Sequence, residues 1–276
     1  MIEPPSRVLR RHGLAARKQW GQHFLRDPSV HAAIVGAAGI GPGDHAVEIG
    51  AGLGTLTAHL LQTGAEIQAI ERDRDLCEVL RAELGSHPRF RLHEADAVGF
   101  DYAANAAEHR TTVVGNLPYH LTGPLLFRLL EAHHQTGPWI VMIQKEVADR
   151  LCASPGNKTY GGITVALSRV RDIVGVVNVP PGAFLPPPRV DSAVIRLDPR
   201  ETPRGEVASE AGYLSLVRTA FQRRRKTLIN ALGGVGSREQ ARAWCEEAGV
   251  DPKLRPERLT PEQFAALQRA REATGA

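Results

Sequence analysis

The chain has 276 residues, of which 42% are hydrophobic, and a formal net charge of +4 at pH 7. No apolar run approaches the roughly 18 residues of a membrane span, and residues 1–5 lack the apolar core of a signal peptide. The three cysteines, Cys77, Cys152 and Cys245, are far apart and show no C-x-x-C spacing, so they support neither a disulfide framework nor a zinc site. We therefore expect a globular cytoplasmic protein of about two domains, with no metal and no membrane contact.

The charge is distributed unevenly along the chain. Residues 1–26 carry six lysine and arginine residues and one acid, residues 27–198 carry 14 basic and 19 acidic side chains, and residues 199–276 carry 14 basic and 10 acidic ones. Basic flanks around an acidic middle favour binding of a polyanion by the two ends. The alternative is that these are ordinary solvated surface charges.

A glycine-rich turn follows the first predicted strand, at residues 44–49. Gly50, Gly52 and Gly54 occupy alternate positions before a helical pattern, and this G-x-G-x-G spacing differs from the G-x-G-x-x-G of dinucleotide folds. The second predicted strand ends in Glu71, at the distance from the turn where nucleotide-binding folds place an acid for the ribose hydroxyls. The combination indicates a nucleoside cofactor, and a purely structural turn is the alternative.

The tetrapeptide Asn116-Leu117-Pro118-Tyr119 follows an apolar strand at residues 111–115. In open α/β sheets, ligands bind at the carboxyl ends of the strands. The tetrapeptide supplies an amide that donates and accepts hydrogen bonds, a proline that keeps the preceding backbone extended, and an aromatic face for stacking. We predict that the chemistry takes place here; a strand end followed by a simple turn is the alternative.

Seven strand-like runs and the helices between them predict an α/β fold. The third strand leads to Asp96, which should share a sheet edge with Gly50, Glu71 and Asn116. The strands are expected at residues 44–49, 66–70, 90–93, 111–115, 139–143, 173–179 and 190–197, and helices after Asp27 and at 73–84, 122–130, 145–151 and 163–169. The expected domains are a basic arm (1–26), a catalytic domain (27–198), a linker (199–210) and a helical domain (211–276).

The last 66 residues show only helical periodicity. Apolar residues repeat at helical spacing on both sides of the basic run Arg223-Arg224-Arg225-Lys226. We expect a basic helix from Arg218 to Lys226, followed by two more helices with capping sequences at their starts.

Five motifs together resemble those of the ribosomal RNA adenine N6-dimethyltransferases. They are Gln22-His23-Phe24-Leu25, Glu48-Ile49-Gly50-Ala51-Gly52-Leu53-Gly54, Asn116-Leu117-Pro118-Tyr119, Phe184-Leu185-Pro186-Pro187-Pro188-Arg189-Val190-Asp191-Ser192 and Phe221-Gln222-Arg223-Arg224-Arg225-Lys226-Thr227-Leu228. The resemblance is greatest to the bacterial small-subunit branch, which is associated with kasugamycin sensitivity. It implies a class I S-adenosylmethionine methyltransferase with a Rossmann-like, seven-stranded mixed sheet and a small all-α C-terminal domain. The family usually has Asn at the position of His23.

The resemblance also implies a binding site for S-adenosyl-L-methionine. Glu71 would accept hydrogen bonds from both ribose hydroxyls, and Asp96 would accept one from the adenine amine of the cofactor. The residues implied to contact the cofactor are His23, Leu25, Gly50, Gly52, Glu71, Asp96 and Asn116.

The implied target is an extruded adenine in front of the tetrapeptide. Its N6 is a poor nucleophile because the nitrogen lone pair is delocalised into the ring. Asn116 Oδ1 and a backbone carbonyl of Leu117 or Pro118 would accept the two amine hydrogens and localise that pair. Tyr119 would stack on the base, with Phe184 as the candidate for the opposite face.

The implied substrate is 16S rRNA within an immature small ribosomal subunit. Two adjacent adenosines in a hairpin loop near its 3′ end would each be dimethylated. The residues expected to bind the RNA backbone are Arg17, Lys18, Arg218, Arg223, Arg224, Arg225 and Lys226.

Three other functions are compatible with parts of the sequence. The related dimethyltransferase of large-subunit rRNA, which confers macrolide resistance, shares the glycine turn and the tetrapeptide, but the segment around Phe184 and the basic run favour the small-subunit enzyme. A ribosome-assembly checkpoint, with catalysis secondary, is also compatible with basic flanks. An NAD-dependent oxidoreductase is the weakest alternative, because the glycine spacing differs.

Overall fold

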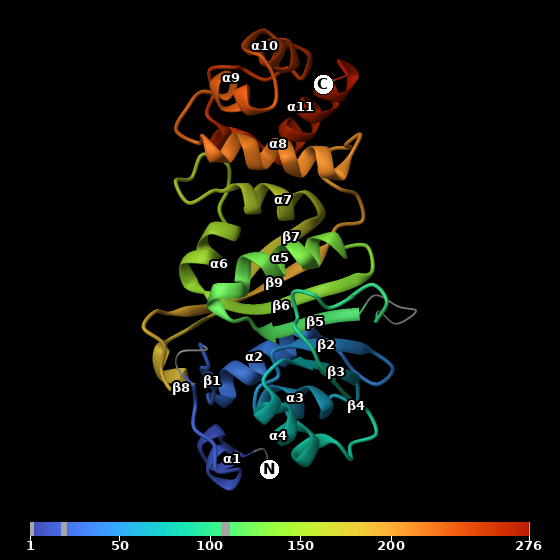
Figure 1. The fold of residues 1–276 in the computed structure, drawn as a ribbon, viewed down its shortest axis with the longest axis vertical. Helices are drawn as coiled ribbons and strands as arrows, with labels where there is room; N and C mark the ends of the chain where they lie inside the picture. Colours follow the sequence, from blue (N-terminus) through green and yellow to red (C-terminus); the bar gives the residue numbers. More distant parts are fainter. Residues whose placement is uncertain (1–2, 18–20, 106–110, 276) are drawn as a thin grey trace. The chain divides into compact units, whose positions relative to one another are not determined.

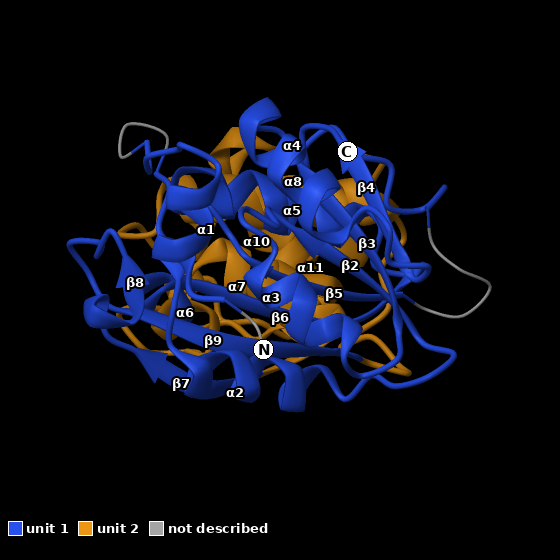
Figure 2. Cartoon of the chain, turned by 90° about the horizontal axis from the view of Figure 1, so that it is seen from below, with its two compact units in different colours: residues 1–148, 174–199 blue, residues 149–173, 200–276 orange. Residues whose placement is uncertain are grey.

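The structure is a computed structural model that describes residues 3–17, 21–105 and 111–275. The chain forms two compact units, which Figure 2 colours separately. Unit 1 comprises residues 1–148 and 174–199, and unit 2 comprises residues 149–173 and 200–276. None of the helices within the described ranges is both long and apolar enough to span a bilayer.

The compact units divide the chain differently from the predicted domains. The predicted basic arm belongs to unit 1, because Val8 and Leu9 are buried in a hydrophobic cluster with Phe24 and Leu53. Residues 149–173 group with the C-terminal helices instead of with the sheet. Tyr160 and Val165 account for this, since both lie in the hydrophobic core formed by those helices.

Unit 1 is built on a seven-stranded sheet with the order β4-β3-β2-β5-β6-β9-β7 (Figure 1). Neighbouring strands from β4 to β6 are parallel, whereas β9 runs antiparallel to β6. The strands are β2 (His45–Ile49), β3 (Glu66–Glu71), β4 (Phe90–Glu94), β5 (Thr111–Asn116), β6 (Thr136–Gln144), β7 (Arg171–Val179) and β9 (Ser192–Pro199). The predicted seven-stranded mixed sheet is confirmed.

The strand register brings three predicted site positions to one edge of the sheet. Ile49, the last residue of β2, pairs with Ile70 on β3 and with Gly115 on β5. Gly50, Glu71 and Asn116, which follow these residues, therefore lie at the carboxyl ends of adjacent parallel strands. This is the edge at which open α/β sheets bind ligands.

Side-chain caps fix the starts of two helices near this edge. Asp27 accepts a hydrogen bond from the backbone N–H of Ser29 at the start of α2, and Asp73 accepts one from Asp75 at the start of α4. The helices of this part of the chain are α1 (Pro5–Arg11), α2 (Pro28–Ala38), α3 (Thr55–Leu61), α4 (Arg74–Leu84), α5 (Thr122–Glu131) and α6 (Lys145–Leu151).

A small second sheet was not predicted. It pairs β1 (Phe24–Leu25) with β8 (Phe184–Leu185) in antiparallel register, so that Leu25 lies opposite Phe184. Two-residue strands show no periodicity of their own, and pairing between such distant segments leaves no local signal in the sequence. The sheet fixes the segment before α2 against the proline-rich segment.

Two histidines of unit 1 stack on each other, the buried His31 and the half-buried His59. His31 on α2 is 3% exposed, its ring centroid lies 4.7 Å from that of His59 on α3, and its Nε2 has no hydrogen-bond partner. Burial, with a smaller contribution from the positive charge of His59, lowers the pKa of His31 to about 4. His31 is therefore neutral in the folded protein at neutral pH.

Acidification is expected to destabilise the fold through His31. An unfolded histidine ionises near pH 6.5, so between about pH 6.5 and about pH 4 the unfolded state binds more protons and stability falls with pH, by up to about 3 kcal/mol. Urea unfolding at about pH 7.5 and about pH 4.5 measures this loss. This loss of stability should be smaller in His31→Leu and unchanged in the control His134→Leu, which replaces an exposed histidine. An undiminished loss in His31→Leu would show that His31 does not cause the acid destabilisation.

Unit 2 is helical in all its regular elements apart from the first residues of β7. Serine and threonine capping boxes start α10 and α11, as the sequence predicts. The helices are α7 (Gly162–Val170), α8 (Glu210–Gln222), α9 (Leu228–Ala231), α10 (Arg238–Glu247) and α11 (Pro261–Ala273).

The predicted basic helix from Arg218 to Lys226 is wrong at its C-terminal half. Helix α8 ends at Gln222, and the basic run forms a turn in which the Lys226 N–H donates to the Arg223 carbonyl at 2.8 Å. The chain then restarts as α9, whose Leu228 N–H donates to the Leu254 carbonyl. This tertiary hydrogen bond replaces the intrahelical one that a continuous helix would need.

Candidate active site

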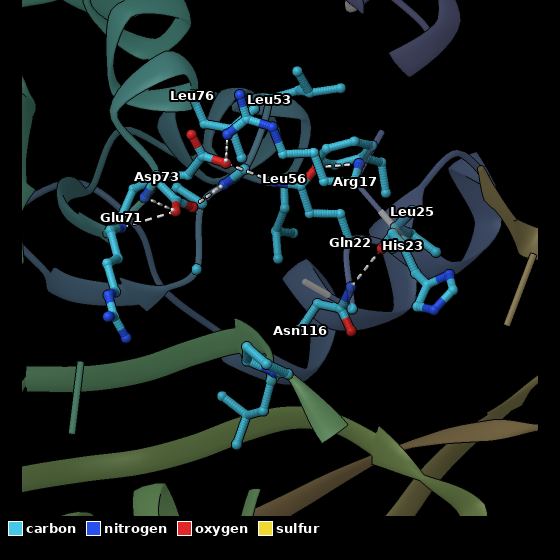
Figure 3. Close-up of a pocket in the computed structure, with 18 of the residues that line it drawn as sticks. Arg17, Gln22, His23, Leu25, Leu53, Leu56, Glu71, Asp73, Leu76 and Asn116 are labelled. Carbon is cyan, nitrogen blue, oxygen red and sulfur yellow. Dashed lines mark hydrogen bonds and ion pairs between the residues drawn. The ribbon is translucent and has the colours of Figure 1, made fainter. Parts of the chain in front are cut away.

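A cavity of about 760 Å³ opens at the carboxyl edge of the sheet. The segment before α2, the glycine turn, the ends of β3 and β5, and the tetrapeptide all contribute to its wall (Figure 3). Every predicted cofactor residue except Asp96 lines this cavity, as do all four residues of the tetrapeptide. The residues predicted from the strand ends therefore line one common cavity of unit 1.

Glu71 is held rigidly by the glycine turn and by the start of α4. Its Oε2 accepts a hydrogen bond from the Gly52 N–H at 2.9 Å, and its Oε1 accepts from Arg72 N–H at 2.8 Å and Asp73 N–H at 2.9 Å. Burial raises the pKa of Glu71, and these three backbone donors oppose the rise. A carboxylate has about four acceptor positions, and three are used here, so at least one stays open for a ligand hydroxyl.

The turn itself requires glycine. Gly50 and Gly52 have φ angles of 72° and 59°, in the left-handed region that disfavours side chains. A Cβ on Gly52 would also lie 3.3 Å from the ring of Phe24. Because Gly50 and Gly52 have no side chains, a nucleoside cofactor can come close to the backbone here, next to the fixed acceptor Glu71.

Asn116 has a fixed amide orientation (Figure 3). Its Nδ2 donates to the backbone carbonyl of His23 at 3.1 Å. Because a carbonyl can only accept, the amide nitrogen must face His23, and Oδ1 must point to the other side. The side chain therefore presents an acceptor whose direction is set before any substrate binds.

Tyr119 begins the 3₁₀ turn η2 (Tyr119–Leu121) and is held from two sides. Its hydroxyl lies 2.7 Å from Ser192 Oγ, and its ring stacks at 6.0 Å and 23° on the ring of His23. His23 Nδ1 lies 2.8 Å from the Pro186 carbonyl, to which it must donate. Burial raises the pKa of the Tyr119 hydroxyl, so the ring stays neutral at physiological pH.

The backbone distinguishes the two candidate carbonyl acceptors. The Pro118 carbonyl already accepts from the Leu121 N–H at 2.9 Å and from Thr122 Oγ1 at 3.3 Å. Leu117 donates its N–H to Met142 and buries its side chain, which is 1% exposed. The Leu117 carbonyl is therefore the better candidate acceptor beside Asn116.

Similarity to known proteins shows the family of this chain. Residues 13–271 match the family described as ribosomal RNA adenine dimethylase. The chain belongs to that family. The ribosomal RNA small subunit methyltransferase A of Myxococcus xanthus (strain DK1622) is 44% identical over 272 residues, covering 98% of this chain and 95% of that protein. The protein of the same name from Anaeromyxobacter sp. (strain K) is 46% identical over 277 residues, covering 96% of each.

Two solved structures share the fold of this family member. A dimethyladenosine transferase from Plasmodium falciparum superposes with a TM-score of 0.74 at 26% identity, covering 92% of this chain and 98% of that one. The 23S rRNA methyltransferase ErmE gives a TM-score of 0.68 at 27% identity, covering 90% of this chain and 99% of that one. Both are methyltransferases, which confirms the predicted class I methyltransferase fold.

Two predicted site residues do not reach the cavity of this dimethylase family member. Asp96 is outside the lining; its side chain is 47% exposed, pairs with Arg72 at 3.1 Å and accepts the Val98 N–H at 3.0 Å. Phe184 is 1% exposed and belongs to the same hydrophobic cluster as Leu25. In this conformation its ring offers no face to a base, because strand pairing turns it inward.

The acids at the start of α4 were missed as site residues. Asp73 is 7% exposed, and its Oδ2 accepts from Gln22 Nε2 at 2.8 Å and from Arg17 at 3.3 Å. Arg17 also pairs with Asp75, and all four residues line the cavity. Arg17, which the sequence predicts to bind RNA, is therefore ion-paired with two acids in the cavity lining. Lys18 lies outside the described residues.

The predicted RNA-binding residues of unit 2 divide into two groups. Arg218, Arg223, Arg225 and Lys226 are exposed. Arg224 instead forms an ion pair with Glu257 at 2.9 Å and donates to the Lys158 carbonyl at 2.7 Å. The exposed group can reach a phosphate backbone, whereas Arg224 also has a role in packing the turn.

Proposed function

We propose that the chain transfers methyl groups from S-adenosyl-L-methionine to N6 of two adjacent adenosines in a hairpin loop near the 3′ end of 16S rRNA. The observation that carries this proposal is the fixed amide of Asn116 in the cavity lining, whose Nδ2 donates to the His23 carbonyl and thereby leaves Oδ1 as an acceptor. The curated relatives named above support the small subunit as the target. An immature small subunit in the cytoplasm is the proposed partner.

The cofactor fits the residues present and supplies an electrophilic methyl group on its sulfonium. Glu71 accepts the ribose hydroxyls, and the backbone at Gly50 and Gly52 allows the methionine end to approach. Asn116 Oδ1 and the Leu117 carbonyl accept the two N6 hydrogens of the target adenine and localise the nitrogen lone pair. The methylated nitrogen is then acidic enough to lose its proton to water, so no strong base is required.

Tyr119 is proposed to stack on the target adenine. Adenine N6 is accessible only in an unstacked or single-stranded nucleotide. An aromatic face stabilises such a base by ~1–3 kcal/mol. Ser192 and His23 hold the Tyr119 ring in place, so the stacking surface is formed before RNA arrives.

Large-subunit rRNA is the alternative substrate. ErmE is a 23S rRNA methyltransferase, and its structure resembles this chain about as closely as that of the Plasmodium enzyme does. Methylation mapping on isolated 16S and 23S rRNA separates the two. The proposal expects modification of adjacent adenosines in 16S rRNA; methylation confined to 23S rRNA would support the alternative.

Loss of the exposed basic side chains in unit 2 is expected to weaken RNA binding. Replacing Arg223, Arg225 and Lys226 with glutamine leaves up to three phosphates without a cation and should reduce the slope of log affinity against log salt by ~0.7–0.9 for each of them. Filter binding across a salt series measures this, and cofactor affinity should not change. Glutamine at Arg238, Arg242 and Lys253, which are also exposed in unit 2, is the charge-matched control. Equal losses in the two triple variants would remove the basic run from the RNA interface.

A further inference from the structure

Gln22 is an amide in the cavity wall whose two polar atoms both have partners (Figure 3). Its Oε1 accepts the Arg17 backbone N–H at 2.8 Å, and its Nε2 donates to Asp73 Oδ2 at 2.8 Å. Because a backbone N–H can only donate, Oε1 must face Arg17, and the amide nitrogen must face the carboxylate. Gln22 therefore has a single orientation, which depends on Asp73.

Asp73 is a buried acid with a different task for each carboxyl oxygen. Its Oδ1 accepts the Asp75 N–H at 3.0 Å and caps α4, whereas its Oδ2 accepts from Gln22 and, at 3.3 Å, from Arg17. The backbone N–H of Asp73 donates to Glu71, the acid proposed to hold the cofactor ribose. A helix cap needs only one oxygen, so the contact with Gln22 is a second task.

His23, the next residue along the chain, contacts the groups proposed to hold the target adenine. Its backbone carbonyl accepts from Asn116 Nδ2 at 3.1 Å, and its ring stacks on Tyr119. The contact with the carbonyl sets the direction of the Asn116 amide. A shift of the backbone at Gln22 and His23 therefore changes where the acceptor oxygen of Asn116 points.

We propose that Gln22 and Asp73 are positioning residues for methyl transfer, which act through the backbone of His23 on the Asn116 amide. Their hydrogen bond joins the start of α4, next to the ribose-binding acid, to the segment that orients the amine-binding amide. Methyl transfer requires close and aligned approach of the reacting atoms, and a displacement of about 1 Å costs up to about 10²-fold in rate. In this role neither residue contacts the adenine. This inference rests on the proposed function.

Reversing the polarity of the hydrogen bond tests the role. Asp73→Asn keeps an oxygen for the cap of α4, because asparagine caps as well as aspartate does, but turns an amide nitrogen toward that of Gln22. Gln22→Glu turns a carboxylate toward the Asp73 carboxylate. Each single variant should lower the single-turnover rate at saturating cofactor by about 10- to 10²-fold. The double variant restores one donor and one acceptor at unchanged net charge and should recover most of the rate.

Three further measurements separate positioning from cofactor binding and from folding. Calorimetric affinity for S-adenosylmethionine should stay close to that of the unmodified protein in all these variants. In an Asn116→Ala background, Asp73→Asn should cause little further loss of rate, because the amide that it positions is gone. Urea unfolding reports stability, and Gln22→Glu leaves the cap of α4 untouched, so its result stands even where Asp73→Asn is less stable. Asp27→Asn makes the same change at the N-cap of α2, outside the cavity lining, and is the matched control; its rate should be unchanged.

The outcomes distinguish this role from the proposed function. Full turnover by both single variants, a loss that the double variant does not restore, or losses that add to that of Asn116→Ala would overturn the positioning role and leave the proposed function intact. A cofactor affinity that falls in parallel with the rate would also overturn it. Absence of methyl transfer by the unmodified protein would instead overturn the proposed function, and this inference with it.

Discussion

Asn116→Ala is expected to lower the rate of methyl transfer by about 10²- to 10³-fold, the range seen when one preorganised polar group at a reacting atom is removed. The alanine cannot accept an N6 hydrogen, so the lone pair of the adenine amine stays delocalised. S-adenosylmethionine binding should be nearly retained, because Glu71 and the glycine turn are unchanged. Single-turnover methyl transfer and calorimetric cofactor binding measure the two quantities separately.

The control for this variant is Asn178→Ala, which removes the same side chain from a position on β7, away from the cavity lining. It should leave both measurements unchanged. Since Asn116 Nδ2 also donates to the His23 carbonyl, a modest loss of cofactor affinity is compatible with the account. Full turnover by Asn116→Ala would remove Asn116 from the mechanism.

Glu71→Ala is expected to weaken cofactor binding by at least about 10²-fold. The substitution removes the charged acceptor for the ribose hydroxyls and leaves three backbone donors, at Gly52, Arg72 and Asp73, without their partner. Of these three residues only Asp73 is buried, and an unpaired buried donor costs about 1–3 kcal/mol. Calorimetry with S-adenosylmethionine measures the loss of affinity, and urea unfolding measures the accompanying loss of stability.

Two comparison variants separate binding from folding. Glu71→Gln keeps the size and one acceptor oxygen, so its binding defect should exceed its stability defect. Glu66→Ala, at the exposed start of the same strand, should show neither. Unchanged affinity in Glu71→Ala would show that this carboxylate does not hold the ribose.

The sheet and its site edge could be predicted because each depends on local sequence signals. The apolar run of β5 is interrupted by Asn116 and Pro118, and the glycines after β2 mark a turn that other residues disfavour. The carboxyl ends of parallel strands then lie at one edge of the sheet, where ligands bind. Gly50, Glu71 and Asn116 were placed together in this way, and the strand register confirms their arrangement.

The remaining site features depend on tertiary contacts that leave no local pattern. Phe184 turns into the core because β8 pairs with β1, and Asp96 is turned outward by its contacts with Arg72 and Val98. Asp73 resembles an ordinary helix cap, and only the fold shows that Gln22 and Arg17 converge on it. Glu48 belongs to the glycine-turn motif, but the sequence does not show that its cross-strand neighbours, Ala69 and Val114, are both apolar.

The most direct test of the account is transfer of tritiated methyl groups from S-adenosylmethionine to purified small ribosomal subunits that lack the modification, followed by nucleoside analysis. The account predicts label in N6,N6-dimethyladenosine from adjacent positions near the 3′ end of 16S rRNA, and its loss with Asn116→Ala. Absence of labelled dimethyladenosine, or label only in another nucleoside, would contradict it.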